Sequence, residues 1–538
     1  MTSTVLVGTS FEVELKLSLP SLDPSGLLTR LAKLPVLARR KPTHHQLHNV
    51  YYDTPEQFLR QQGVALRLRR VGSGTGTQWL QTLKTGGRSK SALSQRGEWE
   101  SPVGSGGLTM AVLQATPWAG IDPDGTVFQA LQASFETTFE RTSWLVRRRD
   151  GSRIEVALDI GQVVAGEKRA PICELELELL AGEPKALFEL AQQIAASVAV
   201  LPATMSKAER GYALAQDAID TPRRAQPPKL AGELPVPEAA GVVLREMFCQ
   251  FTENLNALCR SDDPEVLHQA RVGWRRFKSA LRLFRPALKA TAIPSWQALD
   301  APLTHLGAVR DIDVAKLDTL PPLAQAYTAG DPRRTKGWQT MLLALADDAQ
   351  LQRKAVRDAI LAPALGANLL AATQWLETLC APQPAGDAAA DKKSALRRWS
   401  RRRIARLHRQ LKDAYREAAD PDDEHRVRIL AKRLRYGIEA LRPLLAKRVV
   451  NRWYPQATRL QVSLGAVRDV RQASALVDKL GVDRELVNFL RGFSAGQLVG
   501  AKKLASHFCC QSIVARSHDA AGLTAVRSMG KSPAIVSL

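Results

Sequence analysis

The chain lacks long hydrophobic runs, since no stretch of about 18 consecutive apolar residues occurs in its sequence. Its first residues also lack a basic region followed by an apolar one. We therefore expect neither a membrane span nor a secretory signal. Cysteine is scarce: there are 6, without metal-binding spacing, and Cys509 and Cys510 are adjacent and badly placed to pair with each other. This pattern predicts reduced thiols and excludes a disulfide-built fold.

Aromatic residues make up only 6% of the 538 residues, whereas 45% are hydrophobic and 24% are charged. This composition excludes a disordered or fibrous chain, and the length allows several globular units of roughly 100–200 residues each. Charge is divided unevenly: residues 1–220 hold 24 basic and 23 acidic residues, and the remainder holds 51 and 30. The C-terminal part is therefore expected to attract polyanions.

The first 215 residues are predicted to be mostly strand. Residues 11–17, 64–70 and 173–179 alternate between polar and apolar side chains, the period of a β-strand with two different faces. Short helices are expected near residues 25–34, 127–135 and 184–198.

These strands carry charge on one face and aliphatic residues on the other. Glu12, Glu14 and Lys16 share a face, as do Arg67 and Arg69. For any single strand, exposure to solvent is enough to explain the charged face. Several such strands together favour a closed barrel with the charges inward, because carboxylates on one wall could hold a divalent cation and cations on another a polyphosphate. Buried unpaired charges are prohibitively costly, so such a lumen must be wet or occupied.

The charged strands resemble the CYTH, or triphosphate tunnel metalloenzyme, superfamily over residues 8–215. The resemblance begins with Glu12-x-Glu14-x-Lys16, and the rest of the pattern follows in order. It comprises Tyr52-Asp53-Thr54, Arg67-x-Arg69, Lys84, Arg96-x-Glu98-x-Glu100, Arg141, Asp159-x-Gly161, Glu174-x-Glu176 and Ser206-Lys207. It implies a closed eight-stranded antiparallel β tunnel with flanking helices that binds a triphosphate and a divalent metal.

The resemblance also implies roles for individual residues. The metal ligands would be Glu12, Glu14, Asp159, Glu174 and Glu176. The phosphate-binding residues would be Lys16, Arg67, Arg69, Lys84, Arg96, Arg141 and Lys207. The residues expected to be catalytic are Glu12, Glu14, Lys16 and Glu176. Hard oxygen ligands favour Mg²⁺ or Mn²⁺, and phosphoryl transfer mainly requires positioning and charge neutralisation.

Residues 220–237 hold five prolines and are predicted to be a linker, after which the chain is expected to be helical to about residue 508. Residues 509–538 are predicted to be a disordered tail. The helical part contains a repeat: a similar segment begins at His268 and at His425, and Leu-Gly-Ala-Val-Arg-Asp follows at 306–311 and 464–469. A period this long predicts two similar helical bundles about a pseudo-twofold axis.

Each repeat carries a stripe of cations along one helix face. The first comprises His268, Arg271, Arg275, Lys278 and Arg282, and the second comprises His425, Arg428, Lys432 and Arg435. The pattern resembles the CHAD domain over residues 239–508, which implies polyphosphate binding. A second stripe of the first helix is apolar and is expected to pack: Trp274, Phe277, Leu281 and Phe284. Nucleic acid is the less favoured partner, because the aromatic residues lie mostly on this packing stripe and no groove-entering motif appears.

The sequence thus predicts an α+β multidomain protein with an N-terminal β tunnel and an all-α C-terminal domain of two bundles. The combined resemblance, to bacterial inorganic triphosphatases, implies hydrolysis of inorganic triphosphate to pyrophosphate and phosphate, with long-chain polyphosphate as a second partner. A class IV-type adenylate cyclase, a thiamine triphosphatase and a non-catalytic polyphosphate scaffold remain open. The expected location is the cytoplasm, in association with polyphosphate granules.

Overall fold

A computed structural model describes residues 10–20, 24–72, 77–86, 91–104, 106–288, 291–381, 392–417, 421–481 and 484–496. The predicted tail at 509–538 lies outside these residues. The chain divides into two compact units. One comprises Met1–Gly307, Leu351–Ser400 and Ala440–Leu444, and the other comprises Ala308–Gln350, Arg401–Glu439 and Leu445–Leu538.

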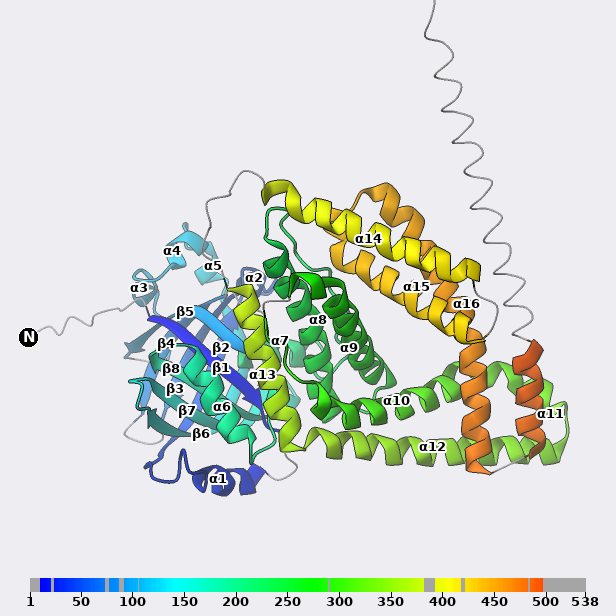
Figure 1. Ribbon diagram of the computed structural model, residues 1–538. Helices are drawn as coiled ribbons and strands as arrows, with labels where there is room; N and C mark the ends of the chain where they lie inside the picture. Colours follow the sequence, from blue (N-terminus) through cyan, green and yellow to red (C-terminus); the bar gives the residue numbers. More distant parts are fainter. Residues whose placement is uncertain are drawn as a thin grey trace, which may run out of the picture. The chain divides into compact units, whose positions relative to one another are not determined.

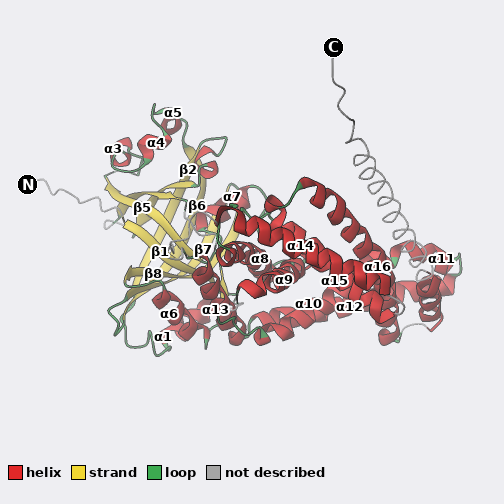
Figure 2. Ribbon diagram, turned by 45° about the horizontal axis from the view of Figure 1, so that its top comes forward, coloured by secondary structure: helices red, strands yellow, loops and turns green. Residues whose placement is uncertain are grey.

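The N-terminal residues of the first unit form one closed antiparallel sheet, drawn in yellow in Figure 2. Its strands are β1 (Ser10–Ser18), β2 (Thr43–Asp53), β3 (Val64–Val71), β4 (Gln78–Thr85), β5 (Leu93–Val103), β6 (Gln132–Arg147), β7 (Arg153–Ala165), β8 (Lys168–Ala181) and the short β9 (Leu201–Pro202). They follow the order β5-β4-β3-β2-β6-β7-β8-β1-β9, and pairing of β5 with β1 closes the barrel. The predicted closed tunnel of eight antiparallel strands is therefore confirmed, with β9 added beside β1.

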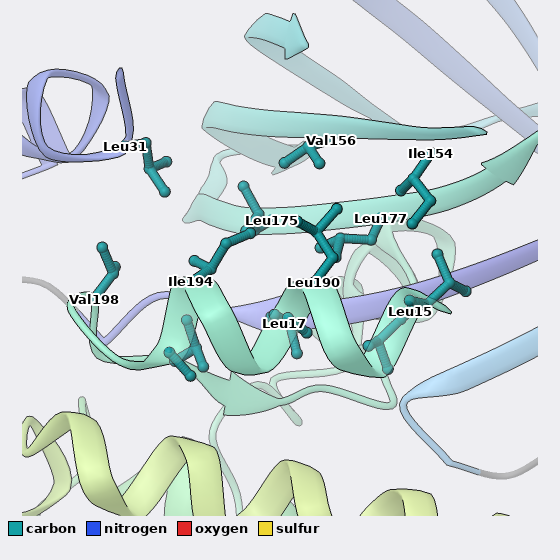
Figure 3. Close-up of a cluster of buried hydrophobic side chains, with 14 of the residues drawn as sticks. Leu15, Leu17, Leu31, Ile154, Val156, Leu175, Leu177, Leu190, Ile194 and Val198 are labelled. Carbon is teal, nitrogen blue, oxygen red and sulfur yellow. The ribbon is translucent and has the colours of Figure 1, made fainter. Parts of the chain in front are cut away.

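The aliphatic faces of the strands point outward and form a hydrophobic core against helices. Leu15 and Leu17 of β1 and Leu175 and Leu177 of β8 contact α6 (Lys185–Ala195), and Leu31 of α1 (Pro24–Ala32) joins the same cluster (Figure 3). Because the side chains of a strand alternate between its two faces, the charged residues between these leucines point into the tunnel.

Short helices lie in other connections between the strands and after the last strand. They are α2 (Phe58–Gln61), α3 (Met110–Leu113), α4 (Trp118–Ile121), α5 (Thr126–Gln129) and α7 (Lys207–Ala215). The helix expected at 127–135 is largely wrong: α5 ends at Gln129 and strand β6 starts at Gln132. Tertiary pairing decides this segment, because Phe135 stacks on Tyr51 of β2 at a ring distance of 4.7 Å.

Most of the residues that the structure describes from Val236 onward are helical, as predicted. The helices of this part are α8 (Val236–Leu258), α9 (Pro264–Phe284), α10 (Asp300–Val314), α11 (Ala324–Thr328), α12 (Pro332–Ile360), α13 (Pro363–Cys380), α14 (Lys392–Glu417), α15 (Pro421–Leu441) and α16 (Lys447–Leu480). Both copies of the sequence repeat adopt the same succession of elements. A 3₁₀ turn at Arg285–Ala287 follows α9, and one at Arg442–Leu444 follows α15.

No single described helix combines the length and the apolar composition of a membrane span. Helices α12 and α13 pass this test only as a pair, and the chain bends by 63° between them.

The proline-containing segment at 220–237 does not separate two compact units. Helix α13 lies against α6 and β9, and α8 also contacts β9 (Figure 1). Leu370 of α13 is 0% exposed and belongs to the same hydrophobic cluster as Leu15 and Leu17. The first helices after the segment thus share a core with the barrel.

We predict that Leu370→Ala destabilises the full-length chain by about 2–4 kcal/mol, because it leaves a cavity beneath the barrel's outer face. Leu351→Ala is the control, since Leu351 is 64% exposed and should change stability little. Urea denaturation of both variants measures the difference. Equal stabilities would show that α13 does not support the barrel.

Candidate functional site

The tunnel encloses a cavity of about 1140 Å³ whose lining is dominated by charged side chains. Of the residues predicted from sequence, the lining includes Glu12, Glu14, Lys16, Arg67, Arg69, Lys84, Arg96, Arg141, Glu176 and Lys207. Asp159 and Glu174 lie behind this surface, with exposures of 0% and 4%. The fold thus brings all twelve predicted tunnel residues into one region.

One group of charged side chains consists of three carboxylates and the cations around them. Oxygens of Asp159, Glu174 and Glu176 lie within 4.8 Å of one another, as the ligands of a single metal ion must. Cations lie against these carboxylates: Lys16 Nζ lies 2.7 Å from Glu176 Oε1, and Lys207 Nζ lies 2.6 Å from Asp159 Oδ2. Hard carboxylate oxygens at this spacing suit a divalent cation such as Mg²⁺.

Arg141 and Lys207 reach this cluster from different elements. Arg141 on β6 faces Asp159 on β7 in the sheet register and donates two hydrogen bonds to it, at 2.8 and 2.6 Å, and one to Glu176 at 2.6 Å. Lys207 is the first residue of α7. The N-cap residue Ser206 and Glu209 form a capping box that fixes the start of this helix.

A second group of charges joins β1, β4 and β5. Arg96 Nε lies 2.9 Å from Glu12, and its Nη2 lies 2.6 Å from Glu14. Lys84 Nζ lies 3.0 Å from Glu12 and 2.9 Å from Glu98. The cations and carboxylates of the tunnel are therefore interleaved, and not separated onto two opposite walls as the sequence suggested.

A third group, on β2, β3, β4 and β5, contains two neighbouring arginines of β3. Arg67 donates to Thr82 Oγ1 at 3.3 Å and lies 3.4 Å from Glu98, and Arg69 donates to Asn49 at 2.9 Å. Burial lowers the pKa of Arg69 to about 10, and the neighbouring Arg67 and Arg141 act in the same direction. Crowded guanidinium groups of this kind favour an anion between them.

Two carboxylates of this cluster, Asp159 and Glu176, are stabilised in their ionised form. Burial alone would raise the pKa of Glu176, but Lys16, Lys207 and Arg141 hold it well below the ordinary value. The same balance raises the pKa of Lys16, because Glu176, Glu14 and Glu174 outweigh the effect of burial. These groups therefore stay charged at neutral pH.

Around Glu178, carboxylates outnumber cations. Burial, followed by the carboxylates of Glu12, Glu98 and Glu155, raises its pKa to about 7. The sheet register places it opposite Glu14 on one side and Glu155 on the other. An excess of carboxylates at this point of the tunnel favours a cation.

Several residues of the site had no predicted role. Glu98 and Glu100 alternate with Arg96, so strand periodicity could have identified them. Tyr51 lines the cavity and hydrogen-bonds Arg67, which with Lys207 lowers its pKa although burial acts in the opposite direction.

Asp53, in the recognised Tyr-Asp-Thr motif, has a structural role. It is 0% exposed and accepts hydrogen bonds from the backbone N–H groups of Leu59 and Arg60 and from the Tyr212 hydroxyl. It thereby fixes the start of α2 and ties β2 to α7.

The predicted polyphosphate-binding residues lie on α9 in the first unit and on α15 in the second. On α9, Lys278 and Arg282 are exposed, whereas His268, Arg271 and Arg275 are half-buried. On α15, His425 is exposed and Arg428, Lys432 and Arg435 are half-buried. Arg435 pairs with Glu439 at 3.3 Å, so this stripe includes a carboxylate neighbour. The packing stripe is confirmed, since Trp274 and Phe277 are buried and stacked at 5.4 Å.

Two family models match the chain: the CYTH domain at residues 10–212 and the CHAD domain at residues 242–478. An inorganic triphosphatase from Haemophilus influenzae is 36% identical over 211 residues. That match covers 38% of this chain and 54% of the relative, so the chain spans about half the length of that protein.

Solved structures with similar folds were also found. The CHAD domain from the plant Ricinus communis is 28% identical with a TM-score of 0.43, covering 52% of this chain and 92% of that one. HpAC1 from Hippeastrum, described as a putative adenylyl cyclase with a dominant triphosphatase activity, is 18% identical with a TM-score of 0.28, covering 38% of this chain and 95% of that one. With TM-scores below 0.5, these likenesses add no weight to a functional conclusion.

We predict that Glu178→Gln stabilises the metal-free protein at pH 8 and not at pH 4.5. Between the ordinary pKa of 4.5 and the folded-state value of about 7, the folded chain holds a proton that the unfolded chain has lost. The free energy of unfolding therefore falls as pH rises through this window, by up to about 3 kcal/mol, and Gln removes that loss.

Urea denaturation in the presence of a chelator measures this difference. Glu140→Gln is the matched control, because Glu140 is exposed on β6 and does not line the cavity. Identical pH dependence in the wild type and Glu178→Gln would contradict the prediction.

Proposed function

Because the chain consists of a CYTH domain followed by a CHAD domain, we propose that its tunnel hydrolyses inorganic triphosphate and that its helical part binds long-chain polyphosphate. The observation that carries the first part is the cavity in which Arg67, Arg69 and Arg141 crowd near a cluster of three carboxylates. Such a cavity complements a compact polyanion together with a divalent cation.

Different residues of the tunnel would have different roles in phosphoryl transfer. The phosphate oxygens would be bound by Lys16, Arg67, Arg69, Lys84, Arg96, Arg141 and Lys207, each of which would exchange a carboxylate partner for substrate. These fixed cations neutralise the charge that develops on the transferring and leaving phosphates. Arginine is suited to this role because its guanidinium binds two oxygens at once.

In hydrolysis, the oxygen of a water molecule attacks the terminal phosphorus, and the bond from that phosphorus to the bridging oxygen breaks. The products are phosphate and pyrophosphate. Carboxylates at Glu12 and Glu14 would orient this water and receive its proton, and Lys16 would neutralise the leaving pyrophosphate.

The carboxylates also fit a divalent metal. Asp159, Glu174 and Glu176 meet the distance requirement, and Glu12 and Glu14 line the same cavity. Mg²⁺ or Mn²⁺, when bound, would supply charge neutralisation on the phosphate oxygens. Although burial acts in the opposite direction, Lys16, Lys207 and Arg141 lower the pKa of Glu176, and Arg141 and Lys207 lower that of Asp159, so both carboxylates are in the ionised form that a cation requires.

Other functions are compatible with the same tunnel. A class IV-type adenylate cyclase or a thiamine triphosphatase would use the same cations, and a non-catalytic polyphosphate scaffold would use only their charge. Assays with tripolyphosphate, ATP and thiamine triphosphate, each with and without Mg²⁺ or Mn²⁺, distinguish these alternatives. A cytoplasmic location in association with polyphosphate granules remains a prediction from the sequence.

We predict that Glu12→Gln lowers the turnover of tripolyphosphate by roughly a hundredfold, since it removes a charge from the water-orienting group and from the partner of Lys84 and Arg96. Glu140→Gln, an exposed change of the same kind, should retain wild-type turnover. Steady-state phosphate release measures both variants, and urea denaturation verifies that they fold. Near wild-type turnover in a folded Glu12→Gln protein would refute the assignment.

The helical part is proposed to bind polyphosphate through the α9 and α15 cations. We predict that replacing Lys278 and Arg282 by Glu weakens the binding of long-chain polyphosphate to the full-length chain. The slope of log affinity against log salt should fall by about 0.7 for each lost contact. Saturating tripolyphosphate in these assays occupies the tunnel.

A double change at Lys185 and Lys354 to Glu is the matched control, because both are exposed and lie outside the two stripes. Equal weakening by the control would show that only net charge matters. Displacement of polyphosphate by RNA or DNA of equal charge, at equal or lower concentration, would favour nucleic acid as the partner.

A further inference from the structure

Among the residues that line the tunnel cavity are Arg223 and Glu253, which follow the barrel and α7 in the chain. Arg223 comes from the proline-containing segment after α7, and Glu253 comes from α8 of the helical part. Both belong to the same compact unit as the barrel. Through Arg223 the proline-containing segment contributes to the cavity that holds the proposed catalytic residues, and through Glu253 the helical part does so.

Arg223 is held in a fixed position by α8. Its backbone N–H donates to Asn254 Oδ1 at 3.1 Å, and its backbone carbonyl accepts from Asn254 Nδ2 at 3.0 Å. Asn254 is 0% exposed, so this clamp is part of the interior. Because Asn254 binds both the N–H and the C=O of Arg223, it fixes the backbone from which the arginine side chain starts.

The guanidinium of Arg223 is only partly satisfied. Its Nη1 donates to Glu253 Oε2 at 2.5 Å, and its Nη2 lies 3.4 Å from Glu246. Its Nε is buried and, among the residues that the structure describes, has no hydrogen-bond partner. The side chain is still 31% exposed, so another ligand can reach it.

Glu253 connects this arginine to the segment that carries Lys207. It accepts a hydrogen bond from the hydroxyl of Thr204, which lies on the chain between β9 and α7. Asn256, one turn further along α8, donates to the carbonyl of Pro202 at 3.0 Å. The position of Glu253 is thus set independently of Arg223.

We propose that Arg223 is a substrate-binding residue that the helical part of the chain supplies to the tunnel, and that Glu253 is its partner until a phosphate chain replaces it. This assignment rests on the proposed function and deepens it. A phosphate brings several oxygens to the exposed part of this guanidinium, whose planar fork of donors can bind two oxygens at once. Glu253 keeps the hydrogen bond from Thr204 after the exchange, so the substrate competes with the ion pairs that Arg223 makes with Glu253 and Glu246.

Calorimetric titration of the full-length protein with tripolyphosphate, with metal omitted, tests the proposal apart from turnover. Arg223→Gln should weaken binding about tenfold, the effect of losing one charge-assisted contact. Glu253→Gln keeps an acceptor for Thr204 but releases Arg223, so it should tighten binding by about threefold. The double variant should bind as Arg223→Gln alone, because Glu253 acts only through Arg223.

Arg260→Gln is the matched control. Arg260 pairs with Asp220 at 2.7 Å, joins the same segment to the end of α8, and does not line the cavity. It should leave binding unchanged. Equal weakening by Arg223→Gln and Arg260→Gln, or binding within twofold of the wild type in a folded Arg223→Gln protein, would overturn the proposal.

Turnover with metal present adds a second readout. Arg223→Gln should raise KM and leave kcat nearly unchanged, whereas a merely structural loss would lower kcat as well. A wild-type protein that binds tripolyphosphate but does not hydrolyse it would refute the proposed function and leave the binding test of Arg223 intact. If Arg223→Gln does not fold, unchanged binding in Glu253→Gln overturns the proposal by itself.

Discussion

The pairing of buried charges between neighbouring strands is the interaction on which the tunnel depends. The sheet register places Lys16 opposite Glu176, Glu12 opposite Arg96, and Arg141 opposite Asp159. Removing one member of such a pair would leave a buried charge without compensation, which costs several kcal/mol. Charge pairing and strand pairing therefore support the same register, and the barrel can keep a polar interior without a ligand.

Positive and negative charges do not balance at every point of the tunnel, and these local excesses affect both stability and ligand binding. Near Arg69 the cations outnumber the carboxylates, whereas near Glu178 the carboxylates outnumber the cations. Each imbalance destabilises the folded barrel and favours a ligand of opposite charge. The proposed ligands, a triphosphate and a divalent cation, would relieve both at once. The features that weaken the barrel are thus the ones that would favour these ligands.

The helical part is also more than a tethered module. Leu370 of α13 completes the core outside the barrel, and α8 holds the segment that leads to Lys207 through its contacts with Pro202 and Thr204. The proline-containing segment is itself clamped by Asn254. The first helices after the barrel therefore share its stability and reach its cavity, even though the sequence families change there.

The sequence by itself determined the strands, their inward charges, the basic helices and their packing stripes. These follow from periods of 2 and 3.6 residues, which a chain carries locally. It could not determine which carboxylate meets which cation, why residues 132–135 are strand, or that Asp53 supports α2. Nor could it place Arg223 and Glu253 at the tunnel. Those outcomes depend on register and on contacts between residues far apart in the chain, such as Lys16 with Glu176 and Tyr212 with Asp53. Only the closed barrel and the helices packed against it bring such residues together.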